Sequence, residues 1–383
     1  MTTLKAVTTK IGSGATPRGG ASVYVDEGAA FIRSQNVLDL CFSNEGLARI
    51  GEDAAEGLRN VAVEPGDVLV NITGDSVARV ALWPRNEPAR VSQHVAIVRC
   101  DPAQVDARYM QYWLHAPAQK AQLLTLSAAG ASRPALTKGM LEAFPFGPHP
   151  LAEQKAIAEV LGALDDKIAA NRQVIAAADR LVESLVVSRL SQRRPLWGSI
   201  DFVFGEAFKG SEFSEPGFGR PLIRIRDLKS QRCQVWTTET RARERVVAPG
   251  EVLVGMDAEF RATRWSGPQG VLNQRVLLAE SDKFGPAIVR HALAAPLAQI
   301  ERSKTGTTVI HLNKSDLMSV EVSLPADGNV MELRSIADPM WLRMVAGERE
   351  NETLAKTRDE LLPLLMSGKI TVRDAEKRVE GVV

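Results

Sequence analysis

The chain has 383 residues, of which 45% are hydrophobic and 24% are charged, the composition of a globular rather than a disordered protein. Its formal net charge of +1 argues against binding nucleic acid chiefly through an excess of basic residues. Three widely spaced cysteines, no signal-peptide-like start and no run of about 18 apolar residues predict a reduced, cytoplasmic protein outside the membrane.

Residues 1–148 are predicted to form a first globular domain, because short β-branched runs alternate with turn-forming residues. Residues 68–72 and 95–98 have the composition of strands, and residues 109–114 that of a helix face. The glycine-rich residues 12–20 are predicted to be an exposed loop.

Residues 149–192 contain the clearest periodicity, from which we predict a spacer helix running from about residue 151 to 190. Spacings of four and three residues alternate along it, as in the apolar seam of a coiled coil. Its one polar member, Asn171, is of the kind that fixes the register between paired helices. The members of the seam are Ile157, Leu161, Leu164, Ile168, Asn171, Ile175, Ala178, Val182 and Leu185.

The second half of the chain repeats the first. Residues 66–70, Gly-Asp-Val-Leu-Val, return as Gly-Glu-Val-Leu-Val at 250–254, and Gln93-His94-Val95 returns as Gln-Arg-Val at 274–276. A second domain is therefore predicted at residues 193–327, a second spacer helix at 328–370 and a tail at 371–383. Pro339 is expected to start or kink that helix.

This plan predicts an α+β fold of two duplicated globular domains separated by two long helices, which form an antiparallel coiled coil within the chain. The alternative is that each helix only covers the sheet of its own domain. Two copies of one module suit a protein that recognises two copies, or two halves, of one kind of target.

Motifs for catalysis are missing from the sequence. It has no phosphate-binding glycine loop, no nucleophile elbow, no methyltransferase motif and no metal-ligand spacing among its five histidines. We therefore expect a non-catalytic chain that binds no metal and no cofactor. The alternative is an enzyme whose active site the sequence does not reveal.

Nine stretches and one dipeptide occur in a characteristic order along the chain. They are residues 66–74, 78–81, 92–99, 130–138, 144–145, 150–154 and 164–168 in the first half, and 207–213, 222–228 and 358–368 in the second. Each stretch alone is weak, but together they span nearly the whole chain and include both duplications. In this order they resemble the specificity (S) subunit of type I restriction-modification systems.

The resemblance implies that the two globular parts are target-recognition domains, each binding one half of a split, asymmetric site in double-stranded DNA. It implies that the helices set the gap between the halves and bind two methyltransferase (modification) subunits, on which restriction (helicase-nuclease) subunits assemble. S-adenosylmethionine would then be bound by the methyltransferase, which withdraws its target adenine from the duplex. Partners would also share the phosphate contacts, consistent with the low net charge.

Candidate DNA-binding residues are basic and amide side chains of the kinds that read guanine and adenine. Arg133 and Lys209 are the stronger candidates, because both lie in polar loops that resemble family motifs. Residues 256–259 differ from their counterparts at 72–74, so the second domain is expected to contact its half-site differently. The full set is Arg18, Arg33, Gln35, Asn36, Arg79, Arg133, Lys138, Lys209, Arg224, Arg226, Arg261, Arg264, Lys304 and Lys314.

Two other functions remain open on the sequence alone. One is a self-contained DNA methyltransferase or nuclease with an unrecognised active site. The other is a protein–protein adaptor with no role in DNA binding, which the two near-neutral domains would permit.

Overall fold

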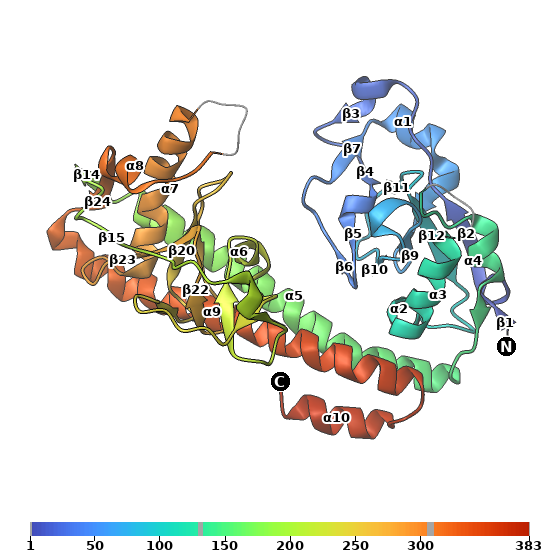
Figure 1. Cartoon of the computed structure of the whole chain (residues 1–383). Coiled ribbons are helices and arrows are strands. Elements are labelled where there is room, and N and C mark those ends of the chain that lie inside the picture. Colours follow the sequence, from blue (N-terminus) through green and yellow to red (C-terminus); the bar gives the residue numbers. More distant parts are fainter. Residues whose placement is uncertain (1, 129–132, 305–309, 383) are drawn as a thin grey trace. The chain divides into compact units, whose positions relative to one another are not determined.

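The structure, a computed structural model, describes residues 2–128, 133–304 and 310–382 (Figure 1). Its contacts divide the chain into two compact units. Unit 1 comprises Met1–Asp166 and Leu354–Val383, and unit 2 comprises Lys167–Thr353. Each unit therefore contains one end of each of the two long helices. The division of the chain into five domains and segments, made above from the sequence, stays a prediction.

Unit 1 is built on two sheets. Its four-stranded antiparallel sheet has the order β10-β9-β12-β2, and its five-stranded sheet has the order β3-β7-β4-β11-β8 with one parallel pair, β4 and β11. The strands are β1 (Thr2–Thr3), β2 (Thr8–Ser13), β3 (Tyr24–Val25), β4 (Ala29–Ile32), β5 (Val37–Leu38), β6 (Cys41–Phe42), β7 (Ala48–Ile50), β8 (Ala62–Val63), β9 (Val68–Asn71), β10 (Val80–Leu82), β11 (Ala89–Val91), β12 (Val95–Cys100) and β13 (Pro145–Phe146). The helices are α1 (Glu52–Gly57), α2 (Ala107–His115), α3 (Pro117–Ala128), α4 (Lys138–Ala143) and α10 (Val372–Glu380).

Unit 2 repeats this topology. Its sheets have the orders β21-β20-β23-β15 and β16-β18-β17-β22-β19, again with one parallel pair, β17 and β22. The strands are β14 (Leu190–Pro195), β15 (Asp201–Phe204), β16 (Phe213–Ser214), β17 (Arg220–Ile223), β18 (Trp236–Thr237), β19 (Val246–Val247), β20 (Val252–Gly255), β21 (Ala262–Arg264), β22 (Gly270–Leu272), β23 (Val276–Glu280) and β24 (Glu321–Pro325). The helices are α6 (Asp227–Ser230), α7 (Gly285–Ser303) and α8 (Lys314–Met318).

The duplication predicted from the sequence is therefore confirmed in the strand order and in the register. Phe31 and Leu222 are equivalent positions of the repeat. Phe31 pairs with Arg90 in the parallel pair of unit 1, and Leu222 pairs with Val271 at the same place in the parallel pair of unit 2. The predicted strands at 68–72 and 95–98 and the helix at 109–114 are also confirmed, as β9, β12 and α2. The predicted loop at 12–20 is wrong for its first two residues, because Gly12 pairs with Ile97 at the end of β2.

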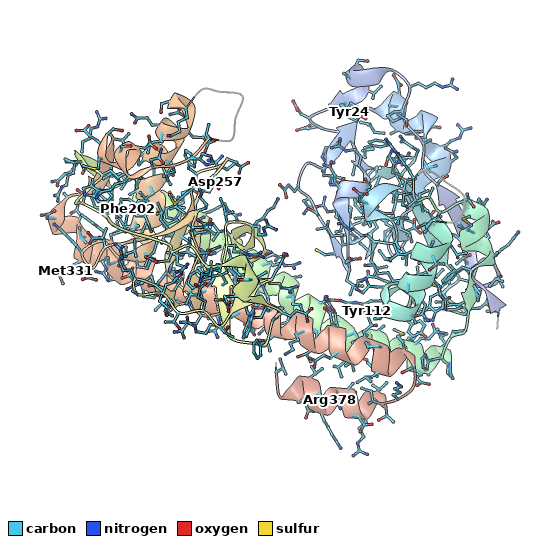
Figure 2. All side chains as sticks on the ribbon, viewed as in Figure 1. Tyr24, Tyr112, Phe202, Asp257, Met331 and Arg378 are labelled. Carbon is cyan, nitrogen blue, oxygen red and sulfur yellow. The ribbon has the colours of Figure 1, made fainter. Side chains whose placement is uncertain are left out.

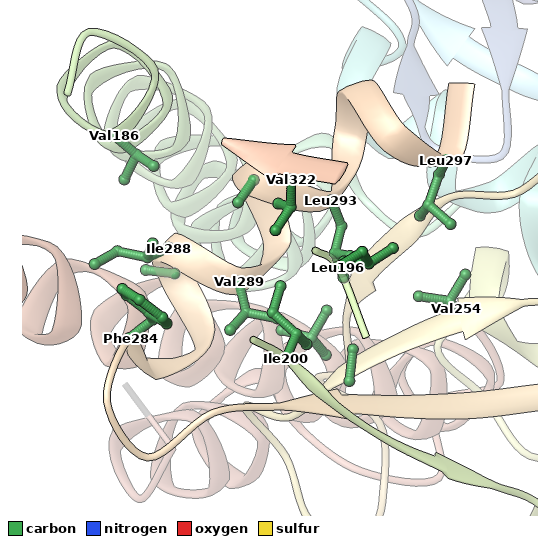
Figure 3. Packing of buried hydrophobic residues seen from close by; sticks show 14 of the residues in the cluster. Val186, Leu196, Ile200, Val254, Phe284, Ile288, Val289, Leu293, Leu297 and Val322 are labelled. Carbon is green, nitrogen blue, oxygen red and sulfur yellow. The ribbon is translucent and has the colours of Figure 1, made fainter. Parts of the chain in front are cut away.

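The central strands β9 and β20 are buried along their whole length, so both of their faces are covered. In unit 2 the covering comes from α7 and from parts of both long helices, α5 (Leu151–Val187) and α9 (Asp327–Met366). Figure 3 shows Ile288 and Leu293 of α7 gathered with Val186 of α5, Val254 of β20 and Val322 of β24. This apolar contact fixes the sheet of unit 2 to the helix pair.

The long helices pair in antiparallel order. In unit 2 the buried amide of Asn171 donates to Glu350 Oε2 at 3.0 Å and to Asn351 Oδ1 at 3.1 Å. Ile175, one turn after Asn171 on α5, contacts Gly347, which lies one turn before Asn351 on α9. A Cβ atom added to Gly347 would lie 3.1 Å from Ile175 Cδ1. Gly347 interrupts the apolar stripe of α9 because the two helices approach closely at that point. In unit 1, Arg358 forms an ion pair with Asp165.

The predicted fold class is thus confirmed, with two qualifications. The alternative in which the helices cover sheets also holds in part, because α9 packs its buried Trp341 against the core of unit 2. Pro339 does not start α9, because the helix begins at Asp327 and continues through Pro339. Pro339 is exposed, so water can bond to the carbonyl that its missing amide leaves free. None of the helices in the described ranges is long and apolar enough to cross a lipid bilayer.

A buried arginine ties β21 of unit 2 to both long helices. Arg264 Nη1 lies 3.0 Å from Asp179 Oδ1 on α5, and its Nη2 lies 2.7 Å from Glu348 Oε1 on α9. The guanidinium stands 5.1 Å from the ring centroid of Trp341. Burial would raise the pKa of Asp179, but Arg290 and Arg264 outweigh it and hold that pKa below its usual value.

We expect Arg264→Ala to lower the free energy of unfolding by about 3–5 kcal/mol, because it removes the buried partner of Glu348 and one of the two arginines paired with Asp179. The matched control is Arg261→Ala, whose side chain is 61% exposed against 8% for Arg264 and pairs with Glu301 at the surface. The free energy of unfolding of Arg261→Ala should fall by less than about 1 kcal/mol. Urea unfolding of the two variants tests this, and equal losses would contradict it.

A buried histidine predicts a specific dependence of stability on pH. Burial, with the neighbouring Arg290 charge, lowers the pKa of His291 to about 4. The unfolded chain takes up a proton near its ordinary value of 6.5 while the folded chain does not, so stability falls as the pH drops from 6.5 toward 4. Between pH 7 and pH 5 this amounts to about 2 kcal/mol. In the His291→Gln variant, the free energy of unfolding should fall by about 2 kcal/mol less over the same pH range, as urea unfolding at pH 7 and pH 5 would show. A variant with the same pH dependence as the unchanged protein would show that His291 does not cause the decline.

Candidate nucleic-acid interface

In unit 1, the end of β9 meets the segment that leads into α4. Thr73 bridges Ala135, Gly74 N donates to Pro134 O at 3.1 Å, and Leu136 N donates to Ile72 O at 2.8 Å. This pairing holds the exposed Arg133, which precedes Pro134 in the chain, beside the end of a rigid central strand.

The turn before β12 adds a line of hydrogen-bonded polar side chains. Thr73 Oγ1 lies 2.7 Å from His94 Nδ1, and Gln93 Nε2 lies 3.1 Å from His94 Nε2. Thr16 Oγ1 donates to Gln93 Oε1 at 2.6 Å. We call Thr16, Thr73, Gln93 and His94 the unit 1 polar surface.

Unit 2 builds the same arrangement from equivalent elements but with other side chains. Leu312 N donates to Met256 O at 2.8 Å, and Asp257 bridges His311. His311 Nδ1 lies 2.6 Å from Asp257 Oδ1, and Arg275 Nη1 lies 3.8 Å from the same oxygen (Asp257 in Figure 2). We call Asp257, Arg275 and His311 the unit 2 polar surface.

Arg275 is exposed and has a φ of 70°, in the left-handed region that costs a branched or long residue free energy. It occupies the place of His94 in the first copy. The candidate set from the sequence does not include Gln93, His94 and Arg275, although all three lie in the repeated Gln-x-Val segment. That repetition was the available signal.

Both polar surfaces lie beside a short helix that begins with an exposed lysine. Lys138 starts α4 after the cap Thr137, whose Oγ1 accepts from Met140 N at 3.2 Å. Lys314 starts α8 in unit 2, with its Nζ 4.7 Å from the ring centroid of Trp197. Lys138 Nζ also lies 3.7 Å from Glu142 Oε1, one turn further along α4, so both lysines have a partner at the surface.

Two sequence-predicted binding residues are corrected by the structure. Asn36 is fully buried, and its amide organises a loop by accepting from Arg33 N at 3.0 Å and donating to Ser43 O and Glu45 O, both at 3.1 Å. Arg264 is buried in the ion pairs described above. Neither side chain can reach a base edge without rearrangement of its surroundings, so we withdraw both.

The other candidates fall into two groups. Five already have partners. Arg33 and Gln35 donate to the carbonyl of Gly46, and the largely buried Arg224 lies 3.4 Å from the fully buried Asp227. Arg261 lies 3.3 Å from Glu301, and Lys304 lies 2.8 Å from Asp316. Because Asp316 lies in α8, it brings Lys304 close to the helix of Lys314. The candidates that are at least partly exposed without such contacts in the described ranges are Arg18, Arg79, Arg133, Lys209 and Arg226.

Thiols and groups of metal ligands are the features of the described residues that bear on catalysis. Burial raises the pKa of the Cys100 and Cys233 thiols to about 12, so both stay protonated and unreactive. Among the described residues, no three His, Cys, Asp or Glu side chains gather in a way that would hold a metal ion. Arginine, lysine and glutamine side chains at exposed turns supply hydrogen bonds and positive charge instead.

Comparison with known proteins gives one curated relative and several solved structures. No protein-family model matches the chain. Over 185 residues, 46% of this chain, it is 30% identical to the type I restriction enzyme EcoBI specificity subunit of Escherichia coli. The match spans only 39% of that relative's length.

The fold is similar to that of the type I restriction-modification S subunit from M. genitalium, with a TM-score of 0.59 and 15% identity. That similarity covers 95% of this chain and 94% of the other. The HsdS subunit from Thermoanaerobacter tengcongensis is 16% identical over 96% of each chain, with a TM-score of 0.35. The resemblance of this chain to the type I specificity subunits is therefore confirmed, in sequence over part of the chain and in fold over nearly all of it.

Proposed function

We propose that this chain is the DNA-sequence-reading subunit of a type I restriction-modification complex, with each unit reading one half of a bipartite, asymmetric site. The observation that carries the proposal is a polar surface built twice. Equivalent strands and turns place Thr73 and His94 in unit 1, and Asp257 and Arg275 in unit 2. A common backbone with different side chains is what two readers of different half-sites require.

The side chains available suit base recognition. Glutamine bonds the edge of adenine and arginine that of guanine in the major groove. Gln93 therefore suits an adenine in the first half-site, and Arg275 a guanine in the second. Lys138 and Lys314, at helix starts beside the readers, suit contacts with phosphates, which position a protein without reading sequence.

The long helices would bind the partner subunits and would set the gap between the two half-sites. Val174 and Leu181 lie seven residues apart on α5, and each is about half exposed. Residues at that spacing share one side of a helix, so α5 carries an apolar stripe outside its contact with α9. This stripe supports docking of two methyltransferase subunits, which would bind S-adenosylmethionine. Restriction subunits would then assemble on that core.

The function assigns methyl transfer and cleavage to the partners and none to this chain. We expect the purified chain to transfer no methyl group from S-adenosylmethionine to DNA, and to support transfer once its modification subunit is added. A radiolabelled methyl-transfer assay with the modification subunit alone as control tests this. Methylation by the lone chain would favour the self-contained enzyme and contradict the proposal.

Two substitutions in unit 1 separate reading from positioning. Gln93→Ala should weaken binding of the complex to its own site by roughly 5- to 150-fold, about 1–3 kcal/mol, and relax discrimination at one base pair. Lys138→Ala should weaken binding to all DNA alike and lower the slope of log K against log salt by about 1. Fluorescence anisotropy over a salt series, on specific and random duplexes, distinguishes the two. Identical behaviour of both variants would show that this surface does not read sequence.

A further inference from the structure

The unit 2 polar surface is arranged around one carboxylate, that of Asp257. Its Oδ1 lies 2.6 Å from His311 Nδ1, a distance at which an imidazole N–H donates a hydrogen bond. Arg275 Nη1 lies 3.8 Å from the same oxygen, which is too far for a hydrogen bond. Asp257 Oδ2 has no partner among the described residues. One carboxylate oxygen and the guanidinium of Arg275 are therefore available to a ligand.

The backbone holds both charged side chains at the surface, where Asp257 is 25% exposed and Arg275 49%. Asp257 forms a bridge with His311, and Ala258 N donates to Ile310 O at 3.1 Å. Ala258 has a φ of 63° and Arg275 a φ of 70°, so each of the two turns places a non-glycine residue in the left-handed region. Such strain is concentrated at binding and catalytic sites. Its presence in both turns points to a function for the two side chains.

The fold itself does not require a carboxylate at this place. The equivalent residue of unit 1 is Thr73, whose Oγ1 lies 2.7 Å from His94 Nδ1, so the same backbone is formed there without an acid. On a surface that we place against DNA, a carboxylate is repelled by the phosphates. A contact of Asp257 with a base would offset this repulsion.

A carboxylate distinguishes cytosine from the other three bases in the major groove. Cytosine presents its N4 amine there and no acceptor, so a carboxylate accepts a hydrogen bond from it without repulsion. Adenine, guanine and thymine each present at least one acceptor, at N7, at N7 and O6, and at O4. Arginine has the opposite preference, because its donors match N7 and O6 of guanine. Asp257 beside Arg275 thus matches the two bases of one G·C pair.

We propose that Asp257 and Arg275 together read one G·C base pair of the second half-site, with Arg275 on the guanine and Asp257 on the amine of the cytosine. The inference rests on the proposed function. His311 bonds Asp257 Oδ1, which leaves Oδ2 for the amine. A methyl group on the cytosine N4 removes the hydrogen that Asp257 accepts, so N4-methylation of this one cytosine should block recognition.

The recognition motif of the complete complex tests the assignment. This chain is assembled with its modification subunits, and methylated adenines are mapped on a library of random DNA. Asp257→Ala should make the complex accept all four bases at one position of one half-site, and that position should be a G·C pair in the unchanged motif. Arg275→Ala should relax the same position. Thr73→Ala, the matched control from unit 1, should leave that half-site unchanged.

Binding to modified DNA is a second measurement, and it does not depend on the folding of a variant. N4-methylcytosine replaces each cytosine of the two half-sites in turn. At one of these cytosines, the unchanged complex should bind roughly 5- to 150-fold more weakly than to unmodified DNA. The Asp257→Ala complex lacks the acceptor and should bind both duplexes alike. Fluorescence anisotropy measures the affinities.

The outcomes separate this inference from the proposed function. Relaxation at an A·T pair, relaxation at no position, or relaxation of different positions by Asp257→Ala and Arg275→Ala would overturn the shared G·C pair. Equal binding of the unchanged complex to every N4-methylated duplex would overturn it as well. In each case, methylation of both half-sites by the unchanged complex leaves the proposed function standing. A complex that methylates neither half-site overturns both.

Discussion

The antiparallel pairing of α5 with α9 is the constraint on which the rest of the structure depends. Its apolar seam holds the helices together, and the buried Asn171, bonded to Glu350 and Asn351, sets their register in unit 2. Arg264 then ties β21 to both helices at once, through Asp179 and Glu348. The sheet that carries the unit 2 polar surface is therefore fixed to the helix pair by buried charge as well as by apolar packing.

Duplication would let one chain read two different sequences, as we propose. The strand order and the parallel pair at the centre of each five-stranded sheet are the same in both units, so the two surfaces are supported alike. The copies differ in side chains on that common backbone, such as His94 against Arg275 and Asn71 against Gly255, and in connecting elements, such as the hairpin β5-β6 of unit 1. Each copy can change its contacts without disturbing the core, because the variable positions lie at strand ends and turns.

The sequence predicted the features that depend on repetition over many residues. A seam sustained over four heptads predicted α5, and two echoed motifs predicted two similar units, because both signals sum over many positions. The fate of single polar residues was not predictable in this way. Asn36 resembles a surface candidate in the sequence, but its amide is enclosed by the fold of its own loop, from Arg33 to Glu45. Arg264 also resembles one, and its partners Asp179 and Glu348 lie 85 and 84 residues away along the chain. The polar surface of unit 1 was missed for the same reason, since strand pairing brings Thr16, Thr73 and Gln93 together.

The central claim is that two diverged copies read two different half-sites held at one separation. Mapping methylated adenines across the genome of the source organism, with and without the gene for this chain, tests it most directly. The account predicts a set of adenines that lose methylation with the chain and that share a bipartite motif of two different halves and one fixed gap. A continuous palindromic motif, or a methylation map unchanged by loss of the chain, would contradict it.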